Sequence, residues 1–132
     1  MIYTDNNATT RVADEVIEEM LPYLGQFYGN PSSMYGFADM VNKKVHQART
    51  QVADLINADP GEIIFTACGT ESDNAAVNAA ISAFPQKKHI ITTAVEHPAI
   101  RNLCFHLQKN KGYKVTFVPV DKKGRLDLDT LY

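Results

Sequence analysis

The residues between 66 and 74 are of the types that bind anionic groups. Gly69 stands just before a run that predicts a helix, and Thr70 and Ser72 follow it with hydroxyl groups. A glycine lets a ligand approach the backbone closely, and a helix start offers unpaired N–H groups at the positive end of its dipole. Together these groups would suit a phosphate cradle at Gly69 and Thr70. From the residues alone an ordinary helix start is the more common case, because Thr70 and Asp73 have the spacing of a capping box.

A histidine follows the next predicted strand, in the sequence Glu96-His97-Pro98. Ligands bind at the carboxyl ends of strands in open α/β sheets, and both this segment and the first loop come after a predicted strand. We therefore expect His97 beside Gly69 and Thr70 over one crevice, where an imidazole can act as an acid, a base or a stacking surface. The alternative is a surface histidine that merely precedes a helix.

The other cysteines and histidines give weaker signals. Cys68 lies at a predicted helix start, a position typical of nucleophilic thiols, but no base accompanies it in the sequence. Cys104 shares an apolar stripe with Ile100 and Leu107 and is predicted to be a small core residue. The remaining histidines lack metal-ligand spacing, so we expect no metal site and structural roles for His46, His89 and His106.

Helical and extended patterns alternate along the chain. Apolar residues at helical spacing predict helices from Val12 to Leu24, where Pro22 should kink or end the helix, and from Phe37 to Leu55, with a stop signal at 57–61. Strands are predicted at 62–65, 89–93 and 114–118, separated by helices at 71–84 and 98–109. Residues 126–132 are typical of another helix start, capped by Asp127 or Asp129. The order predicts an α/β fold with a mostly parallel sheet.

Length and composition limit the function. The chain has 132 residues, the size of one domain, with 45% hydrophobic and 21% charged residues. Thirteen Lys and Arg against fifteen Asp and Glu provide no basic field for nucleic acid or a membrane surface, and no apolar run reaches spanning length. Two cysteines are too few for a disulfide scaffold, and no signal-peptide pattern opens the chain. We expect a cytoplasmic protein that binds neither nucleic acid nor membranes.

The predicted sheet has only three strands. Parallel strands avoid uncovered apolar faces and edges, and the final helix pattern stops about one turn after it begins. We therefore expect the front part of a larger α/β protein, as a truncation, a fragment or one half of a split enzyme.

Five motifs occur in an order that is typical of one family. They are Thr4-Asp5-Asn6-Asn7-Ala8-Thr9-Thr10, Gly29-Asn30-Pro31-Ser32-Ser33, Gly69-Thr70-Glu71-Ser72-Asp73-Asn74, Glu96-His97-Pro98-Ala99, and Val118-Pro119-Val120-Asp121 followed by Gly124. With them the chain resembles the amino-terminal portion of the NifS/IscS-type cysteine desulfurases, which are pyridoxal 5'-phosphate (PLP) enzymes of the class V aminotransferase family. The resemblance covers essentially the whole chain but less than half of a family member. It implies an aspartate aminotransferase-like fold of type I.

The resemblance also implies roles for the residues of the two loops. Gly69 and Thr70 match the positions that hold the PLP phosphate. His97 matches the catalytic histidine that stacks on the pyridine ring and takes part in proton transfer. The matching residues Glu71, Ser72 and Asn74 are expected to support the first loop.

The amino-terminal motif is expected to lie on the substrate side of the site, through Asn7, Ala8 and Thr9. The resemblance thus implies a substrate-side segment over residues 1–12. Residues 13–132 would form an incomplete amino-terminal part of the PLP-binding large domain.

The family converts L-cysteine to alanine and leaves sulfur as an enzyme-bound persulfide for iron–sulfur cluster assembly or thiolation. Its PLP-binding lysine, the aspartate at the pyridine nitrogen, the sulfur-receiving cysteine and the carboxylate-binding arginine come from later sequence, with no counterpart before Tyr132. The chain alone is therefore expected to be inactive and to bind PLP weakly or not at all. Expected partners are L-cysteine, a second copy or a complementary carboxyl-terminal chain, and a sulfur-acceptor or scaffold protein.

Three residues depart from the family pattern. Cys68 stands where a small residue is usual, Tyr35 where histidine is usual, and Ala38 where glycine is usual. These departures leave alternatives open: half of a split desulfurase, a non-catalytic remnant that binds a phosphate compound or a protein, or a related class V enzyme such as a selenocysteine lyase or an aminotransferase.

Overall fold

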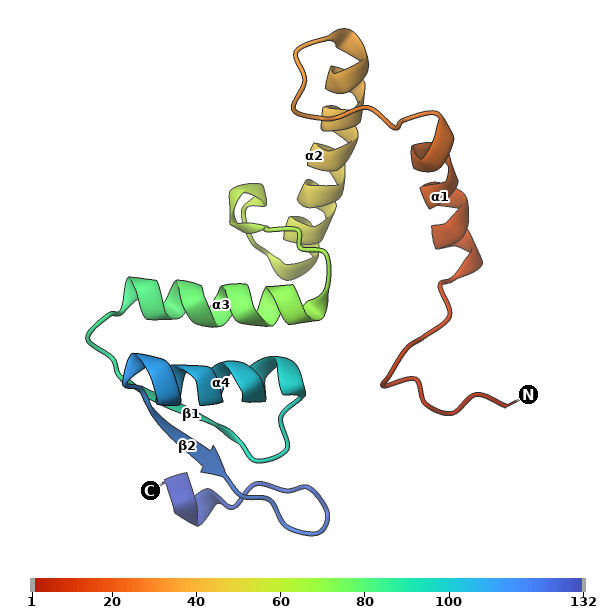
Figure 1. Cartoon of the computed structure of the whole chain (residues 1–132). Helices are drawn as coiled ribbons and strands as arrows, with labels where there is room; N and C mark the ends of the chain where they lie inside the picture. The colour runs from red at the N-terminus through yellow and green to blue at the C-terminus, as the bar shows by residue number, and fades with distance from the viewer. Residues whose placement is uncertain (1, 132) are drawn as a thin grey trace. The chain divides into compact units, whose positions relative to one another are not determined.

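The computed structural model describes residues 2–131, which cluster in two compact units divided between Ile64 and Phe65. Length predicts one domain, but the chain forms two units, each with its own internal contacts. Figure 1 shows the helices and strands of both. The segments 1–12 and 13–132 are defined by function and stay a prediction. Their end residues Met1 and Tyr132 lie outside the described residues.

The first unit contains two α-helices, α1 (Asp14–Gly25) and α2 (Gly36–Ile56), and the 3-10 helix η1 (Pro60–Glu62). Both predicted helices are confirmed within two residues. Pro22 lies inside α1, which ends three residues later, and the carbonyl of Pro22 accepts bonds from the amides of Gln26 and Phe27 at 2.8 Å each. α1 has no buried residue, so its apolar stripe stays at the surface.

A turn at 29–33, the second of the five motifs, connects these helices. The Asn30 side chain accepts from the backbone amide of Ser32 at 2.9 Å. The side-chain amide of Asn42, on α2, donates to the Pro31 carbonyl at 3.2 Å. A Cβ on Gly29 would lie 2.9 Å from the Phe37 ring, so the turn needs a glycine there. These contacts fix the turn against the start of α2.

The stop signal after α2 is also confirmed. Asn57 adopts the left-handed conformation with φ 55°, which ends the helix and suits asparagine better than most residues. The Asp59 amide then donates to the Glu62 carboxylate at 2.9 Å and begins η1. The chain therefore leaves α2 through a left-handed residue and a locally bonded turn.

The second unit contains a parallel two-stranded sheet. β1 (His89–Thr93) and β2 (Lys114–Val118) pair from His89 opposite Lys114 to Thr93 opposite Val118. Both strands have the predicted bounds, and α4 (Pro98–Lys111) connects them as predicted. α4 packs on β2, and α3 (Gly69–Ala83) packs on α4; Figure 1 shows the two helices side by side. The mostly parallel α/β arrangement is confirmed.

The small core of this unit lies between α4 and the sheet. Cys104 is 1% exposed, which confirms its predicted core position, and the ring of Phe105 lies 5.1 Å from that of Phe117 on β2. Strand residues alternate between faces, so Phe117 shares its face with Val115 and with their partners on β1. The other buried apolar residues of this unit are Leu107, Tyr113, Val115 and Val118.

The predicted strand at 62–65 is wrong. Residues 63–66 belong to no strand, and Ile64 is 81% exposed. A strand forms only where a neighbouring strand shares its backbone hydrogen bonds. This segment lies at the division between the units, where the Ile63 carbonyl accepts from the side chain of Arg49 and the segment joins no described strand. The apolar pattern does not specify a partner strand.

The final helix pattern is confirmed as a short 3-10 helix, η2 (Leu128–Leu131), rather than the start of an α-helix. Asp127 caps it, because its carboxylate accepts from the Asp129 amide at 3.1 Å and the Thr130 hydroxyl at 3.0 Å. Of the two predicted caps, Asp127 is therefore correct and Asp129 is wrong. None of the described helices is long and apolar enough to span a membrane.

Candidate functional site

The first predicted loop residues lie in the opening turn of α3. The helix begins at Gly69, two residues before the predicted start, so Gly69 and Thr70 are part of it rather than of a preceding loop. The amide of Ser72 is the first to bond to the preceding turn, at 3.1 Å from the Cys68 carbonyl. The amides of Gly69, Thr70 and Glu71 therefore precede the first helical hydrogen bond, and all three residues are exposed.

The capping box that Thr70 and Asp73 were expected to offer as an alternative is not formed. Cys68 is the residue before the helix and makes no side-chain cap. Instead the Glu71 carboxylate accepts from the Ala67 amide at 2.7 Å, and the hydroxyls of Thr66 and Ser72 share a hydrogen bond. The helix start is thus held by residues other than Gly69 and Thr70.

His97 occupies the cap position of α4, with Pro98 as the first helical residue. Its extended backbone has φ −59° and ψ 147°, and its Nδ1 accepts from the Ala99 amide at 3.2 Å. The side chain is exposed. Because Nδ1 is used by the helix, Nε2 and the ring faces are the parts of the imidazole left for a ligand.

Asn74 connects the two helix starts. Its side-chain amide donates to the Thr70 carbonyl at 2.8 Å and reaches the Ala99 carbonyl at 3.4 Å. This places the opening turn of α3, with Gly69 and Thr70, next to the opening turn of α4, with His97. The structure therefore brings together the three residues that the sequence predicts as the cofactor side of the site.

Glu96, next to His97, has no role of its own among the sequence-based predictions. One of its carboxylate oxygens accepts from the hydroxyls of Thr93 at 2.9 Å and Thr92 at 3.0 Å, and from the Thr93 amide at 3.4 Å. These donors, the Thr93 hydroxyl most of all, hold the pKa of Glu96 below its ordinary value. The signal was present in the sequence as two threonines at a strand end followed three residues later by an acid.

Asn7, Ala8 and Thr9 belong to the first unit, unlike Gly69, Thr70 and His97. They lie in a turn in which the amides of Ala8 and Thr9 donate to the Asp5 carbonyl at 3.1 and 3.4 Å. All are exposed. Their substrate-side role stays a prediction.

The remaining polar candidates have local contacts. His89 Nε2 shares a hydrogen bond with the Thr116 hydroxyl at 2.7 Å, and His106 Nδ1 lies 3.1 Å from the Asn110 amide. Cys68 is exposed, and within residues 2–131 no three His, Cys, Asp or Glu side chains group as metal ligands do.

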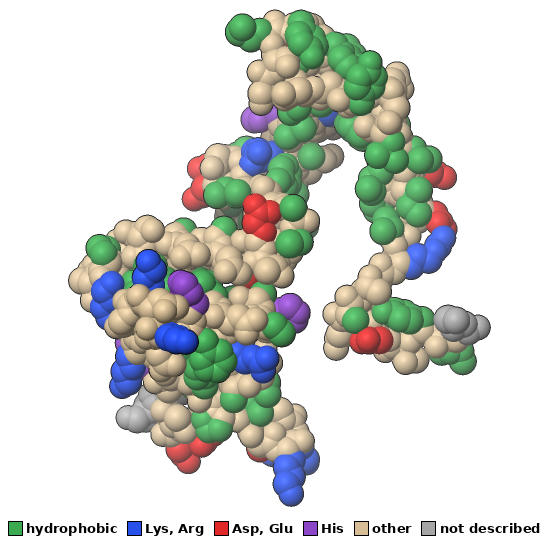
Figure 2. Space-filling view, viewed as in Figure 1, with side chains coloured by type: hydrophobic (Ala, Val, Ile, Leu, Met, Phe, Trp, Pro, Cys, Tyr) green, Lys and Arg blue, Asp and Glu red, His purple; other side chains and the backbone are tan. Residues whose placement is uncertain are grey.

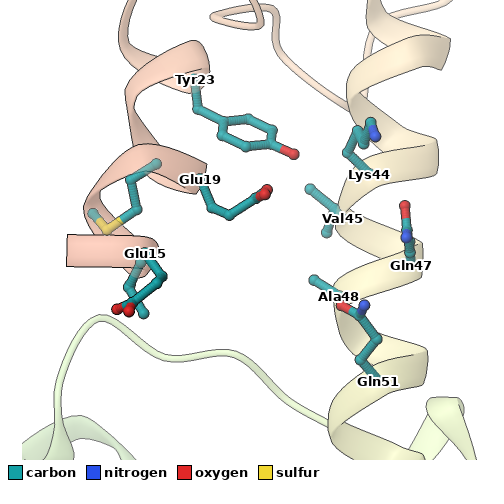
Figure 3. A pocket seen from close by; sticks show the side chains of 10 residues that line it. Glu15, Glu19, Tyr23, Lys44, Val45, Gln47, Ala48 and Gln51 are labelled. Atoms are coloured by element: carbon teal, nitrogen blue, oxygen red, sulfur yellow. The ribbon is translucent and has the colours of Figure 1, made fainter. Parts of the chain in front are cut away.

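A hollow of the first unit lies between α1 and α2 and has a volume of about 700 Å³. In Figure 3, Tyr23 and Glu19 of α1 and Val45 and Ala48 of α2 point into it. No predicted site residue lines it. We therefore place the candidate site at the paired starts of α3 and α4.

The donors at these helix starts fit a phosphate group. Three backbone amides and the Thr70 hydroxyl lie at the positive end of the α3 dipole. Nothing lies within 4 Å of a Cβ built on Gly69, so the space beside its backbone is open to a ligand. An exposed imidazole, that of His97, stands on the neighbouring helix start.

The chain belongs to the class-V aminotransferase family, whose model matches residues 2–132. It is 60% identical over 128 residues to cysteine desulfurase 2 of Trichormus variabilis, covering 97% of this chain and 32% of that protein. It is 50% identical over 129 residues to the cysteine desulfurase NifS of Azotobacter vinelandii, again covering 97% of this chain and 32% of the relative. The chain thus spans about a third of the length of these relatives and corresponds to their amino-terminal part.

Solved structures give the same family. A NifS-like protein superposes with a TM-score of 0.88 at 43% identity, covering 98% of this chain and 36% of that one. The apo cysteine desulfurase of Thermococcus onnurineus NA1 has a TM-score of 0.82 at 32% identity, covering 97% and 32%. The predicted fold class, the front part of an aspartate aminotransferase-like α/β fold, is confirmed.

Proposed function

We propose that the chain supplies the amino-terminal part of a PLP-dependent cysteine desulfurase, with L-cysteine as substrate and persulfide sulfur as product. The observation that carries the proposal is the Asn74 bridge, which joins a phosphate-binding helix start to a helix start capped by histidine. The family and the names of the relatives support PLP and cysteine as the ligands.

Each residue then has a definite task. The amides from Gly69 to Glu71 and the Thr70 hydroxyl bind the PLP phosphate, and His97 presents its ring face and Nε2 to the pyridine ring and the reacting proton. When bound, PLP supplies an electron sink, while the protein supplies orientation and electrostatics. Asn7, Ala8 and Thr9 contribute to the substrate side.

The proposal extends to partners and location. The lysine and cysteine that complete the chemistry must come from sequence outside these 132 residues, either in one longer chain or in a complementary one. As in the family, we expect a homodimer and a sulfur-acceptor or scaffold protein as partner. We also expect a cytoplasmic location. Iron–sulfur cluster assembly is a use for the sulfur that the NifS relative favours.

Titration of the chain with PLP, followed by amide NMR, tests the cofactor side. We expect weak, reversible binding, with the largest shifts at Gly69, Thr70 and Glu71. Thr70→Asp places a carboxylate against the phosphate and should weaken binding by about tenfold or more, since like charges in contact repel. Ser82→Asp, at the exposed other end of the same helix, is the matched control. Shifts spread evenly over the chain, or centred away from Gly69 and Thr70, would contradict the site.

Assay of the chain with PLP and L-cysteine tests its dependence on later sequence. We expect no steady release of alanine or sulfide, because the covalent catalysts of the family are absent. Steady turnover would show that the chain contains its own nucleophile. Recovery of activity on addition of a complementary chain would favour a split enzyme.

A further inference from the structure

We propose that Glu96 is a positioning residue for His97, acting through the two threonines at the end of β1. The inference rests on the proposed function for the role of His97, but its geometry stands independently. Glu96 precedes His97 in the chain, and its carboxylate turns back to the strand that the chain has just left.

The carboxylate joins the turn to the strand at three points. A single oxygen, Oε1, accepts from the hydroxyls of Thr92 and Thr93 and from the Thr93 amide, at 3.0, 2.9 and 3.4 Å. Successive strand residues point to opposite faces. One carboxylate oxygen therefore bonds to hydroxyls that start from different faces of the strand end. Glu96 is half-buried, which limits the water that can replace these donors.

The residues on either side of Glu96 are held as well. The Ala94 amide donates to the Val118 carbonyl at 2.8 Å, which ties the beginning of the turn to β2. At the other end, the Ala99 amide donates to His97 Nδ1. Glu96 therefore links the sheet to His97. The direction of the His97 ring depends on the backbone before it, and Glu96 anchors that backbone to β1.

This arrangement predicts which nitrogen of His97 holds the proton. With Nδ1 accepting from Ala99, the neutral ring has its proton on Nε2, the nitrogen that faces outward from the helix start. Loss of the Glu96 anchor frees the turn, weakens the bond to Nδ1 and mixes the two ring forms. A side chain that merely stabilised the unit would change its unfolding without changing this ratio.

Long-range proton–nitrogen NMR of the His97 ring in the 132-residue chain, with amide exchange at Ala99, tests the proposal. In Glu96→Ala we expect a mixture of ring forms and Ala99 exchange about fivefold faster or more, as expected for a local opening. Glu96→Gln keeps an acceptor oxygen and should restore the wild-type ring. Thr93→Val keeps the shape of the strand residue, loses the hydroxyl and should change the ring in the same direction as Glu96→Ala.

Two controls separate local from global effects. His89, bonded to Thr116 on the sheet, reports the fold and should be unchanged in every variant. Asp121→Ala removes another carboxylate that closes a turn after a strand and should leave His97 unchanged. An unchanged His97 in both Glu96→Ala and Thr93→Val would overturn the proposal, as would an equal change at His89.

The PLP titration distinguishes this proposal from the proposed function. If the variants change the His97 ring but PLP shifts nothing near Gly69, the positioning role stands and the cofactor site fails. If PLP shifts His97 in the wild type while Glu96→Ala leaves its ring unchanged, the cofactor site stands and the positioning role fails.

Discussion

The two thiols of the chain have opposite surroundings. Cys104 lies in the core of the second unit, where burial, and after it the negative charge of Glu96, raise the pKa of its thiol. Cys68 is exposed immediately before α3. A thiol must ionise to react. Burial therefore protects Cys104 in two ways, because it keeps reagents away from the sulfur and disfavours the thiolate.

Alkylation with iodoacetamide should therefore separate the two cysteines. In the native chain we expect Cys68 to react at least about tenfold faster than Cys104, and the two rates to converge in urea. Peptide mass spectrometry over time measures both rates in one sample. Cys68→Ser leaves Cys104 alone as the control, and rapid labelling of that variant would place Cys104 outside the core.

Glu96 also makes stability depend on pH. Its folded pKa lies below its ordinary value of 4.5, because the Thr93 hydroxyl, the Thr92 hydroxyl and the Thr93 amide favour the charged form. The unfolded chain protonates first as pH falls, so this stabilisation is complete above about pH 4.5 and is lost as pH drops through the lower folded pKa.

Glu96→Gln should therefore make the free energy of unfolding in urea less dependent on pH below 4.5. Some pH dependence should remain, because bonds to Arg125 also lower the pKa of Asp121. Urea unfolding at neutral pH and near pH 3.5 measures the difference. Glu18→Gln, at an exposed position of α1, should leave the pH dependence unchanged. Identical curves for Glu96→Gln and the wild type would contradict the assigned hydrogen bonds.

Among the elements, the turn before α2 contains the one described glycine whose replacement the packing opposes. Gly29→Ala would bring a methyl group to 2.9 Å from two atoms of the Phe37 ring, which itself packs edge-on against Tyr28. We expect a loss of about 1–3 kcal/mol in the free energy of unfolding, the usual cost of overpacking. Urea unfolding followed by circular dichroism measures it.

The matched control for this turn is Gly36→Ala, at the first residue of α2, where nothing lies within 4 Å of the new Cβ. Here we expect no loss, and a gain of up to about 1 kcal/mol from helix propensity. Equal effects of the two substitutions would show that glycine flexibility, rather than the Phe37 contact, decides the stability of the turn.

Helices and the β1–α4–β2 crossover could be predicted from the sequence because their signals are local. The apolar spacing of α2 and the proline at the first residue of α4 fix those helices without reference to the rest of the chain. The segment at 62–65 could not be predicted in this way, since a strand depends on a neighbour that no local pattern specifies. The start of α3 was missed by two residues because its bonds come from Thr66, Ala67 and Glu71 rather than from the Thr70 and Asp73 pair.

The candidate site also contains residues that local signals predict and residues that they do not. Gly69, Thr70 and His97 could be named from motifs, because each lies at a recognisable helix start. The roles of Asn74 and Glu96 depend on bonds to residues on other elements, to Ala99 across the helix pair and to the strand end. Only coordinates place those partners.

At the scale of the whole molecule, α1 is a helix that presents its apolar stripe to the surface. It has no buried residue, and its apolar stripe includes Met20 at 53% and Leu24 at 77% exposure. Figure 2 shows hydrophobic side chains at the surface along this helix. An exposed stripe of this kind favours association with another apolar surface.

Native mass spectrometry and light scattering over a range of concentrations should therefore show self-association of the chain. Leu24→Lys should reduce it while changing the free energy of unfolding by less than about 0.5 kcal/mol, because the side chain makes little contact in the monomer. Gln26→Lys adds the same charge two residues away and should leave association unchanged. A marked loss of stability in Leu24→Lys would show that α1 is packed.

The segment at 63–66, between the two compact units, has a consequence for how the molecule is degraded. Proteases cut most readily at exposed positions outside helices and strands, and Ile64 and Phe65 are such positions. One cut beside Ile64 would part the amino-terminal motif from the helix starts that carry Gly69 and His97. A cleavable point thus lies between the predicted substrate side and the predicted cofactor side of the chain, so a single proteolytic event would end any function that needs both.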